Sequence, residues 1–460
     1  MNLIEAINAE ETFTENGMPT YSSSLNNCVD LFFQIGASRG KDIIPQFSKA
    51  INEDTDTALR IALWVRDIRE GAGERQLFKD ILKYLTESSF NAFIPRIIPK
   101  VPELGRFDDL ICLMDTKYEM DVLVLISNEL EKGNGLCAKW MPRKGAFANK
   151  LRRYLNLTPK GYRKLLVALT NVVEQKMCAN DWESIEFGKI PSLAAARYQN
   201  AFNKHVPELY EKYKENLKNG KDKINAGAVY PYDVLKSLKS GDKDISVQQW
   251  NLLPDYLNGN KENLLCLVDV SGSMDTQAAG NLTCLDVAIS LGLYISERSK
   301  GIFQDCFITF SENPKLEKLR GDLFDKYTQI IHSNWGYNTD IEKVFDLILN
   351  AALTHSVKSE DMPTKLIILS DMQFDDAFDN PDLKIFELIE KKYSKAGYKV
   401  PDIIFWNLRN SSGVPVTFHQ KGAALVSGFS PSIMKSILAC TEISPVKIMM
   451  ETINKDRYEL

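Results

Sequence analysis

The sequence predicts a helical-repeat domain followed by an α/β domain with a doubly wound parallel sheet. In the first half, short segments with apolar residues at helical spacing follow one another with short breaks between them. In the second half, apolar strand-like runs alternate with helical segments, a pattern typical of a parallel sheet. Between the halves, residues 216–262 are polar and rich in Gly and Asn, which indicates a domain boundary.

Length and composition agree with a folded protein of more than one domain. The chain has 460 residues, of which 44% are hydrophobic and 25% are charged. This balance excludes disordered, collagen-like and coiled-coil proteins, and the length allows two or three domains. We expect an N-terminal segment over 1–20, the helical domain over 21–240, a linker over 241–261 and the α/β domain over 262–460.

The helices of the first half are recognised by their apolar faces and by the breaks between them. Residues 71–73 separate two of them with glycines. Thr158 and Pro159 form a strong start for another helix, with Thr as N-cap and Pro at the first helical position. The clearest helices are expected at 55–69, 74–85, 121–130 and 159–177.

In the second half, the run Leu264–Val268 is unbroken and apolar, as expected for a strand buried on both faces. Ser430 is expected to cap the last helix. Ligands of such sheets bind at the carboxyl ends of the strands. We expect strands at 264–268, 307–310, 366–369 and 403–406, and helices at 283–298, 340–352, 383–396 and 431–439.

Oxygen-bearing side chains occur where these strands end. Asp269, Ser271 and Ser273 follow the first strand, Asp371 follows the third, and Thr339 lies in a loop just before a helix. We expect all five at one edge of the sheet. Oxygen ligands without nitrogen or sulfur suit a hard divalent cation, and Mg²⁺ keeps positions open for water or for a partner's carboxylate.

The pattern D-x-S-x-S is weak by itself, because it occurs by chance in roughly one chain in ten of this length. The alternative is that Ser271 and Ser273 only shape a turn and that Asp371 only caps a helix. We favour a metal site because three pieces far apart in the sequence converge at strand ends.

Charge is distributed unevenly along the chain. The formal net charge is −5, but residues 139–176 contain ten Lys and Arg and a single acid. Trp140, Phe147 and Tyr154 are interleaved, and cations at the helix start at Pro159 oppose the helix dipole unless an anion binds there. The mixture suits single-stranded RNA; the alternative is a solvated basic face with its aromatics in the core. The residues assigned to RNA are Lys139, Arg143, Lys144, Lys150, Arg152, Arg153, Lys160, Arg163 and Lys164.

Other classes of site are weakly supported. The eight cysteines form no C-x-x-C pair and the four histidines have no metal-binding spacing, so neither zinc nor disulfides are expected. No phosphate loop, zinc-protease motif or nucleophile–base pair is visible, so we expect no enzyme. Arg66 with Asp67, Arg75 with Glu74, and Arg106 with Asp108 and Asp109 are interpreted as structural ion pairs. No membrane span or secretory leader is visible, so we expect a cytoplasmic protein.

In the residues at its strand ends, the second half resembles the von Willebrand factor A domain. Asp269, Ser271 and Ser273 match the first segment of its metal-ion-dependent adhesion site (MIDAS), Thr339 the second and Asp371 the third. The resemblance implies a Rossmann-like fold, Mg²⁺ or Mn²⁺, and ligand binding without catalysis. The sequence departs from the family in having Asn rather than Gly just before the threonine.

The first half resembles the TROVE module, a HEAT-like helical repeat. The matching segments are 21–36, 65–75, 102–110, 162–165 and 190–192. TROVE joined to an A domain is the layout of the Ro ribonucleoproteins, and of a less well characterised eukaryotic and viral family that this chain resembles most. The resemblance implies binding of small structured RNAs and of single-stranded RNA ends, in the host cytoplasm if the protein is viral.

Two hypotheses follow from these features. The first is an RNA-binding ribonucleoprotein component whose A domain holds a divalent cation for a protein partner that presents a carboxylate. The alternative is a metal-dependent protein–protein adaptor without RNA function. Charge reversal in the basic run distinguishes them, because it weakens RNA binding only under the first hypothesis.

Overall fold

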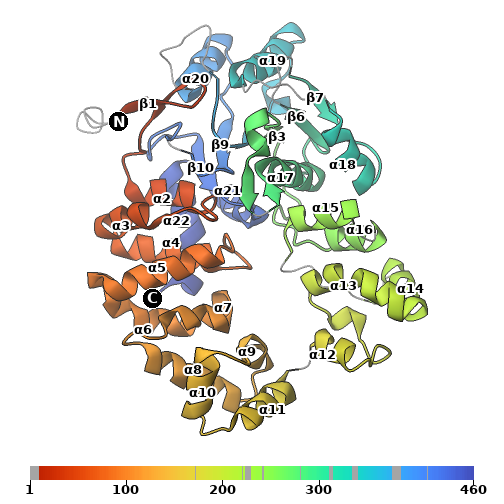
Figure 1. The fold of residues 1–460 in the computed structure, drawn as a ribbon. Coiled ribbons are helices and arrows are strands. Elements are labelled where there is room, and N and C mark those ends of the chain that lie inside the picture. Colours follow the sequence, from red (N-terminus) through yellow and green to blue (C-terminus); the bar gives the residue numbers. More distant parts are fainter. Residues whose placement is uncertain are drawn as a thin grey trace. The chain divides into compact units, whose positions relative to one another are not determined.

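A computed structural model describes residues 10–170, 172–219, 221–222, 229–240, 243–279, 281–309, 314–333, 340–375, 385–411 and 413–460. The chain divides into two compact units (Figure 1). The first contains the described residues within Met1–Ile61, Tyr230–Lys236 and Pro254–Glu459. The second contains those within Ala62–Val229 and Ser237–Leu253, together with Leu460.

The first unit is built on a six-stranded sheet with the strand order β10-β9-β8-β3-β6-β7. Neighbouring strands are parallel except for β6 with β7. β3, β8 and β10 are buried along their whole length, which explains their continuous apolar character. The strands are β3 (Leu264–Val268), β6 (Cys306–Thr309), β7 (Leu316–Lys318), β8 (Lys365–Ser370), β9 (Asp402–Asn407) and β10 (Ala423–Ser427).

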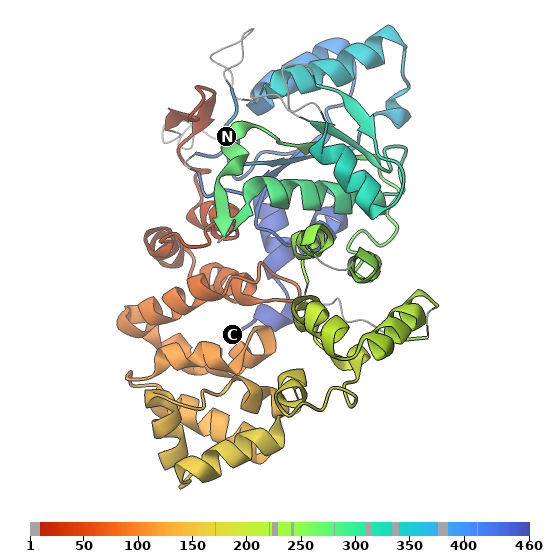
Figure 2. The ribbon, with the colours of Figure 1, turned by 45° about the vertical axis from the view of Figure 1, so that its right-hand side comes forward.

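Helices cover both faces of this sheet (Figure 2). α17 (Cys284–Arg298) packs on β3, β6 and β8 from one face, and α19 (Ile341–Thr354) and α20 (Ile385–Ala396) lie on the other. From β3 the chain adds strands first toward β7 and then toward β10, so right-handed crossovers place the helices on opposite faces. The strand order therefore reverses between β3 and β8, where ligands bind in such sheets. The unit also contains α18 (Leu323–Ile331), α21 (Met434–Ala439) and α22 (Pro445–Ile453).

The N-terminal residues belong to the sheet unit. Side chains of Asn407 and Ser427, at the ends of β9 and β10, donate hydrogen bonds to the carbonyls of Phe33 and Phe32 at 3.1 and 2.7 Å. Gly36 is required beside them, because a Cβ there would lie 2.6 Å from the Ser427 carbonyl oxygen. The elements involved are β1 (Glu11–Phe13), β2 (Pro19–Tyr21), α2 (Asn27–Ile35), α3 (Ile44–Glu53) and the start of α4 (Thr55–Arg66).

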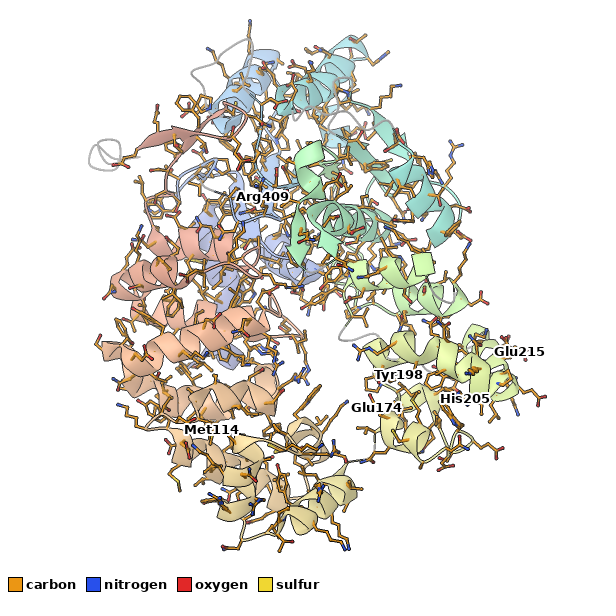
Figure 3. All side chains as sticks on the ribbon, viewed as in Figure 1. Met114, Glu174, Tyr198, His205, Glu215 and Arg409 are labelled. Atoms are coloured by element: carbon orange, nitrogen blue, oxygen red, sulfur yellow. The ribbon has the colours of Figure 1, made fainter. Side chains whose placement is uncertain are left out.

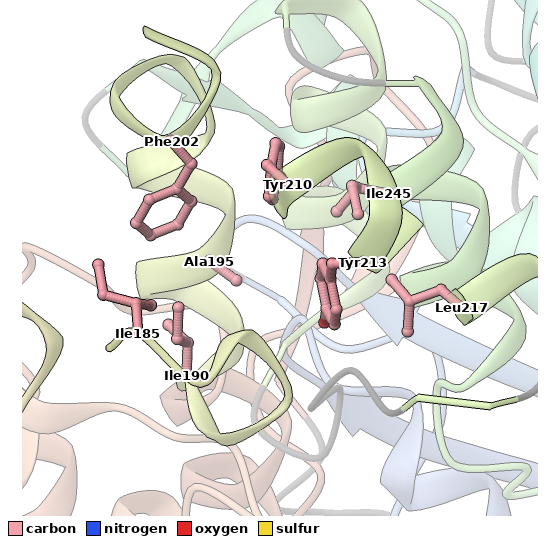
Figure 4. Packing of buried hydrophobic residues seen from close by; sticks show 8 residues of the cluster. All are labelled: Ile185, Ile190, Ala195, Phe202, Tyr210, Tyr213, Leu217 and Ile245. Atoms are coloured by element: carbon pink, nitrogen blue, oxygen red, sulfur yellow. The ribbon is translucent and has the colours of Figure 1, made fainter. Parts of the chain in front are cut away.

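The second unit is helical in its described residues. An apolar and aromatic cluster packs α13, α14 and α16 together (Figure 4), formed by Ile185, Ile190, Ala195, Phe202, Tyr210, Tyr213, Leu217 and Ile245. Its helices are α5 (Arg75–Glu87), α6 (Ile94–Ile97), α7 (Val101–Leu104), α8 (Glu119–Glu131), α9 (Gly135–Trp140), α10 (Ala146–Tyr154), α11 (Pro159–Leu169), α12 (Val173–Cys178), α13 (Ser192–His205), α14 (Pro207–Lys218) and α16 (Lys243–Asn251), while α15 (Pro231–Ser240) is divided between the units. Among the described helices, none has the length and apolar composition that crossing a membrane requires.

The predicted fold class is confirmed as a helix-rich first part followed by a mostly parallel sheet. The predicted strands and helices of the second half fall within about two residues of those observed, except that α21 begins at Met434, after the 3₁₀ turn Pro431–Ile433. The compact units differ from the predicted domains, because residues 21–61 group with the sheet. The predicted linker 241–261 contains α16, whose Ile245 and Trp250 are 1% exposed. β10, α18 and α22 were not predicted.

The helix expected over 159–177 is two helices. α11 ends at Leu169, because the Thr170 hydroxyl bonds to the Leu166 carbonyl at 2.7 Å and the Thr170 backbone is extended. α12 then begins at Val173. A β-branched residue whose hydroxyl competes for backbone groups is a local reason for this break.

Candidate functional site

Two buried carboxylates lie at the carboxyl ends of the adjacent strands β3 and β8. Asp269 directly follows β3 and Asp371 directly follows β8, and both are 0% exposed. Asp269 is held by uncharged donors. The Ser370 hydroxyl donates to Asp269 Oδ2 at 2.5 Å, and the Ser271 N–H donates to Oδ1 at 2.9 Å. Both acids therefore lie at the point where the strand order reverses.

The electrostatics of this edge favour a cation. Burial, followed by the charge of Asp371, raises the pKa of Asp269 to about 6. Two carboxylates in a water-poor site disfavour each other's ionised form, and a cation between them removes that penalty. The hydroxyls of Ser271 and Ser273 lie 3.0 Å apart on the adjoining turn. Carboxylate and hydroxyl oxygens form a donor set that fits Mg²⁺ or Mn²⁺.

The structure brings four of the five predicted ligands together: Asp269, Ser271, Ser273 and Asp371. Thr339 lies outside the described residues. Among the residues the structure describes, no group of three or more His, Cys, Asp and Glu side chains could hold a metal. A site of two carboxylates and several hydroxyls does not form such a group, so metal binding stays a prediction.

The alternative roles of these side chains are observed only in part. Asp371 Oδ1 accepts a hydrogen bond from the Gln373 N–H at 3.3 Å, which shapes the local turn. Ser271 precedes the 3₁₀ turn Gly272–Asp275, but its side chain makes no capping hydrogen bond. Turn shaping therefore accounts for one oxygen of Asp371, whereas the Ser271 hydroxyl is paired with the Ser273 hydroxyl and does not cap the turn.

Sequence reasoning missed Arg409 and Glu15. Arg409, which is labelled in Figure 3, follows β9. Its Nη1 lies 3.3 Å from Asp371 Oδ2 and 3.5 Å from Glu15 Oε2. Arg409 had a signal, since β9 was predicted and its carboxyl end lies beside that of β8. Glu15 had none, because it comes from the N-terminal hairpin.

The nine residues predicted to bind RNA lie on α9, α10 and α11 and in the segments that join them. Six are exposed and form no ion pair within the described part of the chain: Arg143, Lys144, Arg153, Lys160, Arg163 and Lys164. We call these six the basic surface. α11 packs against both α9 and α10, so the three helices form one local assembly.

The other three predicted residues are half-buried and engaged with neighbours. Lys150 Nζ lies 2.5 Å from Asp115 and 2.7 Å from Glu119. Arg152 donates to Asn149 Oδ1 at 3.1 Å. Lys139 Nζ lies 5.2 Å from the centre of the adjacent Trp140 ring. These three are less suited to bind phosphate than the six of the basic surface.

Of the interleaved aromatics, one remains available for stacking. Phe147 is 7% exposed and belongs to the core, whereas Tyr154 is 38% exposed. The Trp140 ring is covered by the Arg106 guanidinium at 3.3 Å. The predicted cap of α11 is confirmed, because Thr158 Oγ1 accepts from the Gly161 N–H at 3.1 Å.

The arginines interpreted as structural form a network around two aspartates. Asp109 is bound by Arg66 at 2.7 Å and by Arg75. Asp108 is bound by Arg75 at 2.7 Å and by Arg106 at 2.6 Å. Gly105 leaves space for the Arg66 side chain, since a Cβ at position 105 would lie 2.4 Å from the Arg66 guanidinium. The structural role of the arginines is confirmed, and so is the expected pair of Arg106 with Asp108. The expected partners of Arg66 and Arg75 are wrong, because these arginines bind Asp109 and Asp108 and not Asp67 and Glu74.

Comparison with known proteins gives the class of the chain. Two family models match it, each described as a domain of unknown function: DUF2828 over 14–90 and 146–264, and DUF7788 over 263–459. The junction falls at the predicted start of the α/β domain. The chain belongs to the family of the uncharacterized protein L728 of Acanthamoeba polyphaga mimivirus, with 30% identity over 509 positions covering 97% of this chain and 87% of the relative.

A viral relative agrees with the predicted kinship. Among solved structures, the crystal structure of the Deinococcus radiodurans RO (RSR) protein matches with a TM-score of 0.35 and 15% identity, covering 89% of this chain and 90% of that chain. A TM-score and an identity this low do not establish a shared fold or function. The TROVE and von Willebrand A resemblances stay predictions.

Proposed function

We propose that this protein binds RNA through the basic surface of its second unit. The observation that supports this is the accumulation of six exposed cations without an acidic partner among the described residues. Like charges gathered in one place repel one another, and a phosphate backbone relieves that repulsion while releasing counterions. The exposed Tyr154 ring adds a surface on which an unpaired base can stack.

The expected ligand is a small structured RNA with a single-stranded end. Stacking on an exposed aromatic ring requires a base that is not paired, whereas the cations contact phosphates of either form. A blunt duplex therefore lacks one of the two contributions. A tailed RNA is expected to bind more tightly than a blunt duplex of equal length.

The test reverses four charges of the basic surface: Arg143→Glu, Arg153→Glu, Arg163→Glu and Lys164→Glu. Titration against a hairpin with a single-stranded 3′ tail, at two salt concentrations, is expected to show a loss of more than about tenfold. The slope of log affinity against log salt is expected to become shallower by about 3, since each phosphate contact contributes about 0.7–0.9.

The matched control reverses four exposed cations of the other unit: Lys300, Lys315, Lys318 and Arg320. It changes the net charge equally, so a nonspecific charge effect would weaken both variants alike. Unchanged RNA binding in a folded variant of the basic surface removes this assignment and leaves the adaptor hypothesis.

A second function is supported by the strand-end geometry. We propose that Asp269, Ser271, Ser273 and Asp371, with Thr339, hold Mg²⁺ or Mn²⁺, which presents an open position to a carboxylate of a protein ligand. We propose binding and not catalysis at this site. Calorimetric titration with Mn²⁺ is expected to show one site in the full chain and none in Asp269→Asn. Equal binding by both proteins would remove the site.

A further inference from the structure

The N-terminal hairpin lies across the loop that carries Asp371. We call residues 14–18 the N-terminal loop and residues 371–375 the Asp371 loop. The side chains of Thr14 and Asn16 donate hydrogen bonds to carbonyls of the Asp371 loop at 2.7 and 2.8 Å. A further bridge joins the two loops at Gly17. Segments more than 350 residues apart in sequence are thus bonded at the candidate metal centre.

These bonds place Glu15 beside the candidate ligands. The Glu15 N–H donates to Gln373 Oε1 at 2.6 Å, and Gln373 is 1% exposed. One nitrogen of Arg409 lies 3.5 Å from Glu15 Oε2 and 3.3 Å from Asp371 Oδ2, so the two oxygens are within about 7 Å of each other. The Glu15 side chain is 61% exposed, so its carboxylate is accessible from solvent.

We propose that Glu15 is the protein's own carboxylate ligand for the divalent cation at this site, and that an external carboxylate has to displace it. The inference rests on the proposed metal centre. An exposed ion pair between Glu15 and Arg409 alone gives no reason for the loop to be anchored on the Asp371 loop by three side chains. The Glu15 N–H is bonded to the buried side-chain amide of Gln373, whereas the Glu15 carboxylate is exposed.

Two observations support exchange of a cation or a carboxylate between Glu15 and Asp371. A guanidinium nitrogen already lies between the two carboxylates, so Arg409 competes with a divalent cation for the same oxygens. The Gln373 amide has its oxygen bonded to Glu15, but its nitrogen has no hydrogen-bond partner among the described residues. A buried donor without an acceptor is unfavourable, and an additional carboxylate oxygen at this place would satisfy it.

The experiment measures Mn²⁺ binding to the full chain, using the electron paramagnetic resonance signal of free Mn²⁺. Glu15→Gln is expected to weaken binding by about tenfold or more, in the range observed when a group that supports a metal site is removed. Sodium acetate is expected to restore the affinity of Glu15→Gln and to leave the wild type unchanged. Glu10→Gln, an exposed neighbour at the start of the same hairpin, is the matched control and is expected to bind normally.

Arg409→Gln provides a variant with the opposite expectation. Removal of the competing cation tightens Mn²⁺ binding, which a variant that merely failed to fold would not do. Weakened binding by Arg409→Gln overturns the competition. Acetate that tightens the wild type as much as Glu15→Gln shows an open position and overturns the role of Glu15.

The two levels of failure are distinguishable. If the wild type binds Mn²⁺ no better than Asp269→Asn does, the metal centre is wrong and the role of Glu15 with it. If binding depends on Asp269 but Glu15→Gln equals the wild type, the metal centre stands and the role of Glu15 alone is wrong.

Discussion

The two units bury acidic side chains in opposite ways. In the second unit, Asp109 is 0% exposed and is bound by two arginines, Arg66 and Arg75. In the first unit, Asp269 is equally buried, but its hydrogen-bond donors among the described residues are the uncharged Ser370 and Ser271. Burial of a carboxylate does not by itself indicate a ligand site. Burial of a carboxylate that has no positively charged partner does indicate one.

The largest expected effect concerns Asp109, the buried aspartate that is paired with arginines. Asp109→Asn leaves the buried Arg66 guanidinium without its counter-charge, and breaking such a pair costs about 3–5 kcal/mol. Urea denaturation of the full chain measures it. Asp108→Asn, which is partly exposed, is the control and is expected to cost less. A loss below about 1 kcal/mol for Asp109→Asn would contradict the structural role.

Asp269 is expected to make the stability of the first unit depend on pH. Its pKa of about 6 in the folded chain exceeds the ordinary value of 3.8, so the folded state binds the proton more tightly than the unfolded state. The contribution of Asp269 to stability in EDTA is then fully present below about pH 4 and is lost as pH rises through about 6. The loss is at most about 3 kcal/mol. Asp269→Asn is expected to remove this fall, and an unchanged pH profile would contradict it.

Stabilisation by a divalent cation is expected to depend on the buried aspartate of the first unit and not on the aspartates of the second. Mg²⁺ at a hundred times its dissociation constant stabilises a binding protein by about 2.7 kcal/mol. We expect a stabilisation of this order in the wild type and in Asp108→Asn, and none in Asp269→Asn. Thermal unfolding with Mg²⁺ and with EDTA measures it. Stabilisation that persists in Asp269→Asn would place the cation elsewhere.

The smallest effects are expected within the basic run. Lys150 is engaged by Asp115 and Glu119, which raises its pKa, whereas Lys164 is exposed and unpaired among the described residues. Lys164→Gln is expected to weaken binding of the tailed hairpin about two- to threefold, and Lys150→Gln by less. If Lys150→Gln has the larger effect, the RNA lies on the other side of α10.

The candidate metal ligands could be predicted because their placement follows from local patterns. An unbroken apolar run before Asp269 and another before Asp371 indicate buried parallel strands, and the carboxyl ends of parallel strands meet at one edge. Arg409 follows a third strand of the same kind and was within reach of this reasoning. Glu15 was not, because a three-residue strand has no distinctive local pattern.

The basic run illustrates the opposite limit. Its charge is visible in the sequence, but which cations are free is decided by packing. Lys150 and Arg153 lie three residues apart on α10, yet one faces acids of a neighbouring segment and the other is exposed. Likewise Phe147 turns to the core while Tyr154 does not.

The sequence by itself determined the order of elements, the alternation that makes a parallel sheet, and the convergence of Asp269 and Asp371, since these depend on periodicity and on the geometry of parallel strands. Only the tertiary structure decided that residues 10–61 belong with the sheet and that Glu15 and Arg409 lie beside Asp371. Those contacts join residues hundreds of positions apart. They are fixed by steric fit, as at Gly36 against Ser427, and by hydrogen bonds that no local pattern encodes.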